Sequence, residues 1–236
     1  MKVGIIQPYF LPYIGYFQLI ASVDKFVIYD NIKYTKKGWI NRNRMLQNGT
    51  DKVFSIPLSK ASDRLDIVER EISPDFNRQK LLSQFRGCYL KAPYFEDVWP
   101  LIESIVSFRD DNLFRYIQNS ILLMCDYLDI DTEIIVSSSV EADHDLLSQD
   151  RVLSICGALN ANTYVNPRGG VELYSADEFA SKDLELKFIK TNTIEYMQFG
   201  DSFVPSLSVL DVLCFNSFQE VRAIIEDQFC IIDGFD

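Results

Sequence analysis

Apolar and polar positions in the first 30 residues predict a strand, a loop, a helix and a second strand. The apolar run 2–6 predicts the first strand, residues 14–21 predict an apolar helix, and residues 25–29 predict a second strand that ends at Asp30. Together they form one βαβ unit. Because open α/β sheets bind ligands where strands end and helices begin, the connecting loop, residues 7–16, is the expected site.

The pattern becomes helical in the middle of the chain and alternates again after it. Helices are predicted over residues 74–89, 95–108 and 112–128, the first of them opened by Pro74-Asp75. Later strands are predicted at 132–137, 163–165 and 184–189, and later helices at 150–159, 174–182, 208–216 and 218–228. This order predicts an α/β fold with a doubly wound, mostly parallel sheet, in a single domain of residues 1–236 with a helical insert or cap at 74–130.

A turn signal, Asn48-Gly49, lies between two β-rich runs and predicts a hairpin. The second run, residues 53–58, is expected to re-enter the main sheet. Pro57 would then lie near the end of that strand, where the missing N–H of proline is tolerated.

Residues 31–44 carry five basic side chains and no acidic one, in a chain whose net charge is −11. They follow the second strand, so these bases are expected to approach the same sheet edge as the first loop. Arginine offers a planar fork for phosphate or carboxylate, and Trp39 offers a stacking plate. Alternation as a strand would place Trp39, Asn41 and Asn43 on one face and Ile40, Arg42 and Arg44 on the other. The stretch predicts an anion site; the alternative is a solvated hairpin.

Composition limits the classes of partner. The acidic balance argues against general nucleic-acid binding, which needs a broad basic surface. Five scattered cysteines without a C-x-x-C pair, no recognisable signal peptide and no stretch of about 20 apolar residues predict a cytoplasmic protein without a membrane span. His144 is the single histidine, so neither a metal site nor a Ser–His or Cys–His catalytic unit is expected.

The first loop has the chemistry of an anion-binding turn. Pro8 and Pro12 stiffen the connection, and Gly15 allows close approach to the backbone. The amides of residues 14–16 are expected to be unpaired at the start of the helix and to favour a phosphate or carboxylate. The alternative is that proline and glycine only shape a turn and the tyrosines pack as core.

Two later segments add candidates. Residues 166–170, Asn-Pro-Arg-Gly-Gly, follow a strand and can present backbone amides and Arg168 to an anion, which together with the first loop suggests a two-sided cleft. Ser206 and Ser208 precede a helix; either caps it, or Ser206 faces the cleft. A general base would come from Asp30, Glu172 or Asp211, and a proton donor from a tyrosine.

Several of these segments resemble the WbqC-like protein family. The resemblance is carried by residues 7–17, 24–30 and 36–44, with further pieces at 164–174 and 203–211. It implies a role in O-antigen or related surface-polysaccharide biosynthesis, for which a glycine transferase activity has been suggested. It also implies association with other enzymes of glycan biosynthesis.

A more distant resemblance is to nucleotidyltransferases with a Rossmann-like fold. In those proteins a His/Thr-x-Gly-His motif follows the first strand, where this chain has Tyr13-Ile14-Gly15-Tyr16. The resemblance implies the same sheet. Because both outer positions are tyrosine, adenylyl or cytidylyl transfer loses the histidines on which it depends.

Three functions remain open: a transferase with an anionic, activated donor, a non-catalytic nucleotide or phosphosugar-binding module, and a divergent nucleotidyltransferase. No cofactor follows from the residues, although a nucleotide-activated or acyl donor fits the chemistry. The candidate catalytic residues are Tyr16, Asp30 and Arg42. The candidate binding residues are Gln7, Tyr9, Pro12, Gly15, Lys36, Trp39, Asn41, Asn43, Arg44, Asn166, Arg168, Gly169, Gly170, Tyr174 and Ser206.

Overall fold

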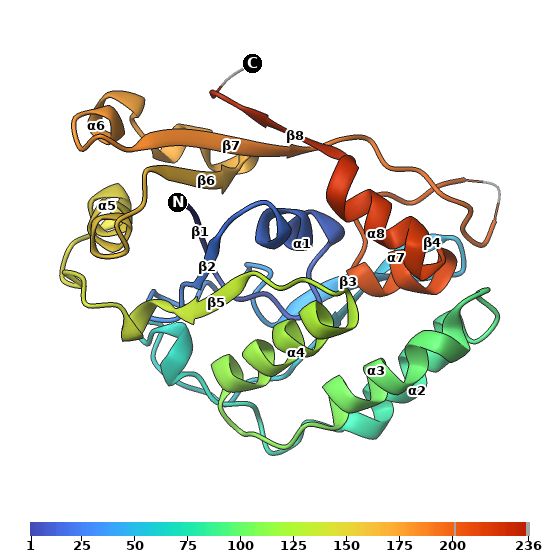
Figure 1. The fold of residues 1–236 in the computed structure, drawn as a ribbon. Helices are drawn as coiled ribbons and strands as arrows, with labels where there is room; N and C mark the ends of the chain where they lie inside the picture. The colour runs from blue at the N-terminus through green and yellow to red at the C-terminus, as the bar shows by residue number, and fades with distance from the viewer. Residues whose placement is uncertain (201, 235–236) are drawn as a thin grey trace.

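A six-stranded sheet forms the centre of the computed structural model, which describes residues 1–200 and 202–234 (Figure 1). The strand order is β5-β2-β1-β6-β7-β8, and all neighbours are parallel except β7 and β8. The strands are β1 Lys2–Ile6, β2 Lys25–Ile28, β5 Glu133–Val136, β6 Thr163–Pro167, β7 Glu185–Thr191 and β8 Phe229–Ile232. The predicted α/β fold with a mostly parallel, doubly wound sheet is confirmed.

Alternate side chains of the sheet enter two different cores. Val27 of β2 packs into a small core with helices α5 (Ser148–Ala158) and α6 (Ala176–Ala180). Its neighbours Phe26 and Ile28 enter a larger core on the opposite face, to which α1 (Ile14–Ala21), α4 (Leu113–Tyr127) and α8 (Phe218–Asp227) contribute. A strand with apolar side chains on both faces is typical of a sheet covered on both sides.

The direction of winding reverses at β1. From β1 the chain builds outward through β2 to β5, and it then returns to the other side of β1 for β6 and β7. After β1 the chain enters α1 on the large-core face, and after β6 it continues to α6 on the small-core face. The carboxyl ends of β1 and β6 therefore form a topological switch point, where the two connections diverge and leave room for a ligand.

The predicted hairpin is confirmed, but its predicted place in the main sheet is wrong. Strands β3 (Arg42–Gln47) and β4 (Thr50–Ser55) pair around Asn48 and Gly49, both with positive φ, in a separate two-stranded sheet. In β4 the side chain of Phe54 is buried and the other residues are exposed. A strand with a single buried side chain cannot fill a position inside a sheet that is covered on both faces.

The predicted alternation from Trp39 to Arg44 is also wrong, because β3 begins only at Arg42. The preceding residues form turns, and Arg42 Nε donates a hydrogen bond to the Gly38 main-chain oxygen at 2.9 Å. The chain thus folds back, and the guanidinium carbons of Arg42 and Arg44 lie 5.4 and 5.6 Å from the centre of the Trp39 ring.

The predicted helices are all present. The middle helices are α2 Arg78–Tyr89, α3 Phe95–Ser107 and α4, and α7 Val209–Phe215 precedes α8. The predicted loop at 166–170 continues into a 3₁₀ turn, Arg168–Leu173, and α6 covers only 176–180 of the predicted helix 174–182. Strand β8 was not predicted, because its four residues continue the apolar run of α8 and lie at the edge of the sheet. The description of residues 74–130 as an insert or cap stays a prediction.

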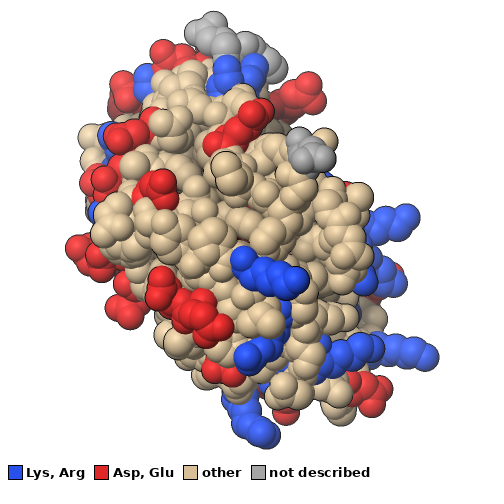
Figure 2. Space-filling model, turned by 90° about the vertical axis from the view of Figure 1, so that its right-hand side faces the viewer, with Lys and Arg blue, Asp and Glu red and all other residues tan. Residues whose placement is uncertain are grey.

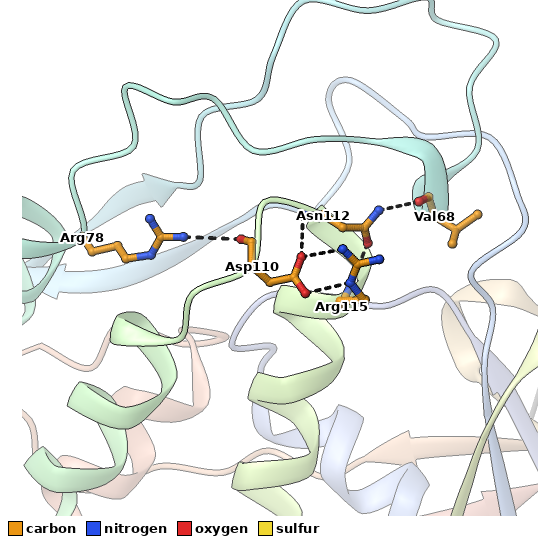
Figure 3. Close-up of polar contacts among 5 residues, drawn as sticks. All are labelled: Val68, Arg78, Asp110, Asn112 and Arg115. Atoms are coloured by element: carbon orange, nitrogen blue, oxygen red, sulfur yellow. Dashed lines mark hydrogen bonds and ion pairs between the residues drawn. The ribbon is translucent and has the colours of Figure 1, made fainter.

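A polar network joins the middle helices to the segment that follows the hairpin (Figure 3). Asn112 caps α4 through a bond from the Arg115 N–H to its Oδ1, and its Nδ2 donates to the Val68 oxygen at 2.6 Å. Asp110 accepts two hydrogen bonds from the Arg115 guanidinium, at 2.7 and 2.8 Å, and Arg78 reaches the Asp110 main-chain oxygen. The network fixes the start of α4.

Replacing Asn112 by alanine removes both the cap and the bond to Val68. We expect the free energy of unfolding to fall by about 1–2 kcal/mol, as measured by urea denaturation. Asn112→Ser retains a capping oxygen and should recover part of this loss; equal stability of the two variants would contradict the role of the cap.

Hydrogen bonds from Arg115 hold the pKa of Asp110 below its ordinary value of 3.8. A lowered folded-state pKa stabilises the native state above the unfolded-state value, and this contribution is lost as the pH falls through the folded-state value. Asp110→Asn should therefore be less stable than the parent at pH 7, and the difference should fade below pH 3.8. Asp111→Asn removes the adjacent carboxylate and serves as the control in the same pH series of denaturation curves.

Candidate functional site

A cleft of about 580 Å³ opens at the switch point, where β1 and β6 end. We call it the switch-point cleft. Its walls combine the end of β1, the first loop, the residue after β2 and the segment after β6. The sequence-predicted residues that line it are Gln7, Tyr9, Gly15, Tyr16, Asn166, Gly169, Gly170 and Tyr174. Sequence reasoning thus identified both walls of this cleft.

The first loop is held in one conformation by contacts from two distant segments. The Leu11 main-chain oxygen accepts hydrogen bonds from Asn43 Nδ2 at 2.7 Å and from Ser208 Oγ at 2.8 Å. Leu11 has φ 46°, a left-handed conformation that is uncommon for a non-glycine residue and needs such support. The Phe10 N–H also donates to the Ile40 oxygen at 2.9 Å. The loop is therefore a preformed wall of the site.

Tyr13 covers the start of α1. A Cβ atom on Gly15 would lie 2.3 Å from the Tyr13 hydroxyl, so the ring rests directly on the glycine backbone. A glycine is thus required at position 15, because the Tyr13 ring packs directly against its backbone. The Tyr16 N–H donates to the Tyr13 main-chain oxygen at 3.1 Å, so the prediction that all three first-turn amides are unpaired is wrong for Tyr16.

The tyrosine hydroxyls at the cleft are proton donors rather than bases. Tyr16 is buried, and its hydroxyl donates to the Gln7 main-chain oxygen at 3.2 Å. Burial raises the pKa of Tyr16 well above the ordinary value of 10.0, and it also raises the pKa of Tyr9, Tyr29 and Tyr174. All four hydroxyls therefore remain protonated at neutral pH.

A second cavity of about 390 Å³ adjoins the cleft across the first loop. We call it the arginine cavity, because Arg44 supplies its charge. Arg44 donates to the Ser206 main-chain oxygen at 2.9 Å and lies 3.4 Å from Asp51, and the half-exposed Trp39 ring lies beside it. The other predicted residues that line this cavity are Tyr9, Pro12, Asn43 and Ser206.

The second loop is arranged around Asn166. Its Oδ1 accepts a hydrogen bond from Tyr164 at 3.1 Å, and the Tyr164 and Tyr174 hydroxyls are 3.0 Å apart. A Cβ on Gly170 would lie 2.1 Å from Asn166 Nδ2, whereas a Cβ on Gly169 would meet no atom within 4 Å. Gly170 is therefore the position at which only glycine leaves space for the asparagine.

Five predicted site residues line neither cavity. Asp30 is buried and accepts hydrogen bonds from the Ser138 N–H and Oγ at 2.9 and 2.7 Å, so it fixes the end of β5. Asn41 bonds to Tyr34 and to the Ile56 oxygen. The remaining three are Lys36, which pairs with Asp63, Arg42, which bonds to the turn before β3, and the exposed Arg168.

Other lining residues were missed. Tyr13 borders the switch-point cleft, the arginine cavity and a third hollow near β7, although its place inside the loop motif gave a signal. Tyr29 directly follows β2, which was a positional signal. Ser148 and Gln149 come from the start of α5, and no sequence pattern indicated them.

Charge is unevenly distributed over the surface. Figure 2 shows that Asp and Glu gather along the left of one face, whereas Lys and Arg occupy its right and lower parts. Within residues 1–200 and 202–234, no group of three or more His, Cys, Asp and Glu side chains is arranged to hold a metal ion. In the same part of the chain, no helix has both the length and the apolar character needed to cross a bilayer.

The fold and the cleft define a Rossmann-like α/β protein with a preformed cavity at its switch point. The chain belongs to the WbqC-like protein family, whose model matches residues 7–223. It is similar to the uncharacterized protein Rv1507c of Mycobacterium tuberculosis (strain ATCC 25618 / H37Rv), with 28% identity over 217 residues, 90% of this chain and 92% of that protein. No solved structure matches the chain. The matched region includes every residue named above as lining the two cavities.

Adjacent glycines provide a matched test of the second loop. Gly170→Ala places a methyl group against Asn166 Nδ2 and should lower the free energy of unfolding by about 1–3 kcal/mol, because the buried amide must move. Gly169→Ala meets no neighbour and should change it by less than about 0.5 kcal/mol. Thermal and urea unfolding of both variants measure the difference; equal effects would contradict the packing described here.

Proposed function

We propose that the protein is a transferase of surface-glycan biosynthesis that binds an anionic, activated donor along the first loop. The observation that carries this proposal is the junction of the two cavities. Tyr9 and Tyr13 line both of them, so one elongated ligand can extend from the switch-point cleft to Arg44. Membership of the WbqC-like family supports the association with O-antigen and related polysaccharides.

Arg44 is the residue best suited to hold the anionic part of the donor. A guanidinium carries five N–H donors, and the contacts with Ser206 and Asp51 leave some of them free. Those contacts also restrain the side chain before a ligand arrives, which lowers the entropy cost of binding. The Trp39 ring beside it offers a flat surface for stacking.

Catalysis at this site would depend on positioning and on stabilisation of charge. The tyrosine hydroxyls can donate protons or hydrogen bonds, and Tyr16 positions the end of β1 through the Gln7 oxygen. Asp30 and Arg42, predicted to be catalytic, act in our proposal by holding β5 and Trp39 in place.

A non-catalytic binding module is the second candidate. It is favoured by one observation: among the described residues, neither cavity is lined by a carboxylate, a histidine or a lysine that could serve as a general base. Such a module would hold a nucleotide or phosphosugar for a partner enzyme. A divergent nucleotidyltransferase has less support, because Tyr13 and Tyr16 replace the histidines of that motif.

Arg44→Gln should weaken the binding of an anionic donor about tenfold or more, since a hydrogen bond to a charged group contributes about 1.5–3 kcal/mol. Calorimetric titration with nucleotides, nucleotide-sugars and acyl-CoA measures the loss. Lys52→Gln removes the same charge from an exposed position on β4 and is the matched control. Equal losses in both variants would assign the effect to net charge and contradict the proposed site.

Product formation separates the two candidate functions. The donor that binds is incubated with amino-sugar acceptors or glycine, and products are followed by mass spectrometry. A product that is lost in Arg44→Gln supports the transferase. Tight binding without product from any acceptor supports the binding module.

A further inference from the structure

The switch-point cleft contains no charge of its own. Among the described residues that line it there is no Asp, Glu, Lys, Arg or His side chain. Among the described residues that line the arginine cavity, Arg44 is the only charged one, and it lies on the far side of Tyr9 and Tyr13. Charge is therefore segregated, with an uncharged compartment at the sheet and a cationic one beside the hairpin.

The start of α1 also offers an anion little space and one fewer free N–H group. The Tyr13 ring rests on Gly15, and the Tyr16 N–H is already paired with the Tyr13 oxygen. Helix N-termini attract phosphate through exposed amides, and here the Tyr13 ring occupies the space beside the Gly15 Cα, which leaves less room for a phosphate at the first turn. The geometry thus directs the anion away from the helix and towards Arg44.

Two carboxamides offer hydrogen bonds to the cleft from opposite sides of the switch point. Gln7 directly follows β1, and no hydrogen bond joins its side-chain amide to any residue that the structure describes. Asn166 lies on β6; its Oδ1 is held by Tyr164, and its Nδ2 has only a 3.2 Å contact with the Pro167 oxygen. The pair offers a free donor and acceptor at Gln7 and a donor at Asn166.

Planar amides beside aromatic rings match the edge and the face of a nucleobase. A carboxamide presents its donor and its acceptor in one plane, which is the arrangement of a base edge. Tyr9, Tyr13, Tyr29 and Tyr174 border the same cleft and offer rings on which a base can stack. Since no charged side chain competes, an uncharged base meets no desolvation penalty from an unpaired ion.

We infer that the switch-point cleft binds the base of a nucleotide, read by Gln7 and Asn166, while the phosphates lie past Tyr13 at Arg44. This inference rests on the proposed function and deepens it, because it assigns the donor class as nucleotide-linked. It also assigns Tyr13 a role in specificity: the ring separates the base from the phosphates and keeps the phosphates off α1.

A crossed pair of variants tests the inference by calorimetric titration. Gln7→Leu removes the free amide at similar volume. It should weaken the binding of a nucleoside and of its diphosphate by the same factor, about fivefold to tenfold, and leave the binding of inorganic pyrophosphate unchanged. Arg44→Gln should weaken the binding of the diphosphate and of pyrophosphate and leave the binding of the nucleoside unchanged. Four nucleosides, their diphosphates, pyrophosphate and methyl glycosides form the panel, and thermal unfolding verifies that both variants are folded.

The outcomes distinguish the inference from the proposed function. The base assignment is overturned by any of three results. These are that nucleosides do not bind, that methyl glycosides bind in their place, or that Gln7→Leu weakens the binding of pyrophosphate as much as that of the diphosphate. An Arg44-dependent anionic donor would in each of those cases still support the proposed function. Nucleoside binding that depends on Gln7, without binding of any anionic ligand, would support the base site and overturn the anionic donor.

Discussion

The site depends on one main-chain oxygen, that of Leu11. It accepts hydrogen bonds from Asn43 in the hairpin and from Ser208 at the start of α7, segments that lie 32 and 197 residues away in sequence. These two bonds hold Leu11 in a left-handed conformation and fix the loop that separates the two cavities. The Val209 N–H donates to the neighbouring Pro12 oxygen at 2.8 Å. Without these contacts, the strained residue would lack the support that such a conformation needs.

The first loop separates an uncharged cleft from a cavity that contains a positive charge. On one side, amides and neutral tyrosines border an uncharged cleft. On the other side, Arg44 borders a cavity that is also lined by aromatic side chains. The net charge of −11 does not oppose an anionic ligand here, because the potential inside a cavity depends on the groups nearest to it.

Local pattern was sufficient for much of the fold and for part of the site. The βαβ unit, the middle helices and the Asn48-Gly49 turn followed from periodicity and turn chemistry, which act over a few residues. The two walls of the cleft followed from the switch-point rule. Lys36, Asn41 and Arg168 were grouped with the site because of their types, and they bind elsewhere or face solvent. Side-chain direction in a turn depends on distant partners, which a local pattern does not contain.

The sequence by itself determined the alternation of strands and helices, the loop at the end of β1 and the glycines that allow close approach. Only the tertiary structure decided that β3 and β4 stand apart from the main sheet, that Arg44 rather than Arg42 enters a cavity, and that Tyr13 covers Gly15. The physical reason is the distance along the chain over which each kind of interaction acts. Backbone preference and hydrophobic period are local, whereas the contacts that orient Leu11, Arg44 and Asn166 join residues brought together by packing.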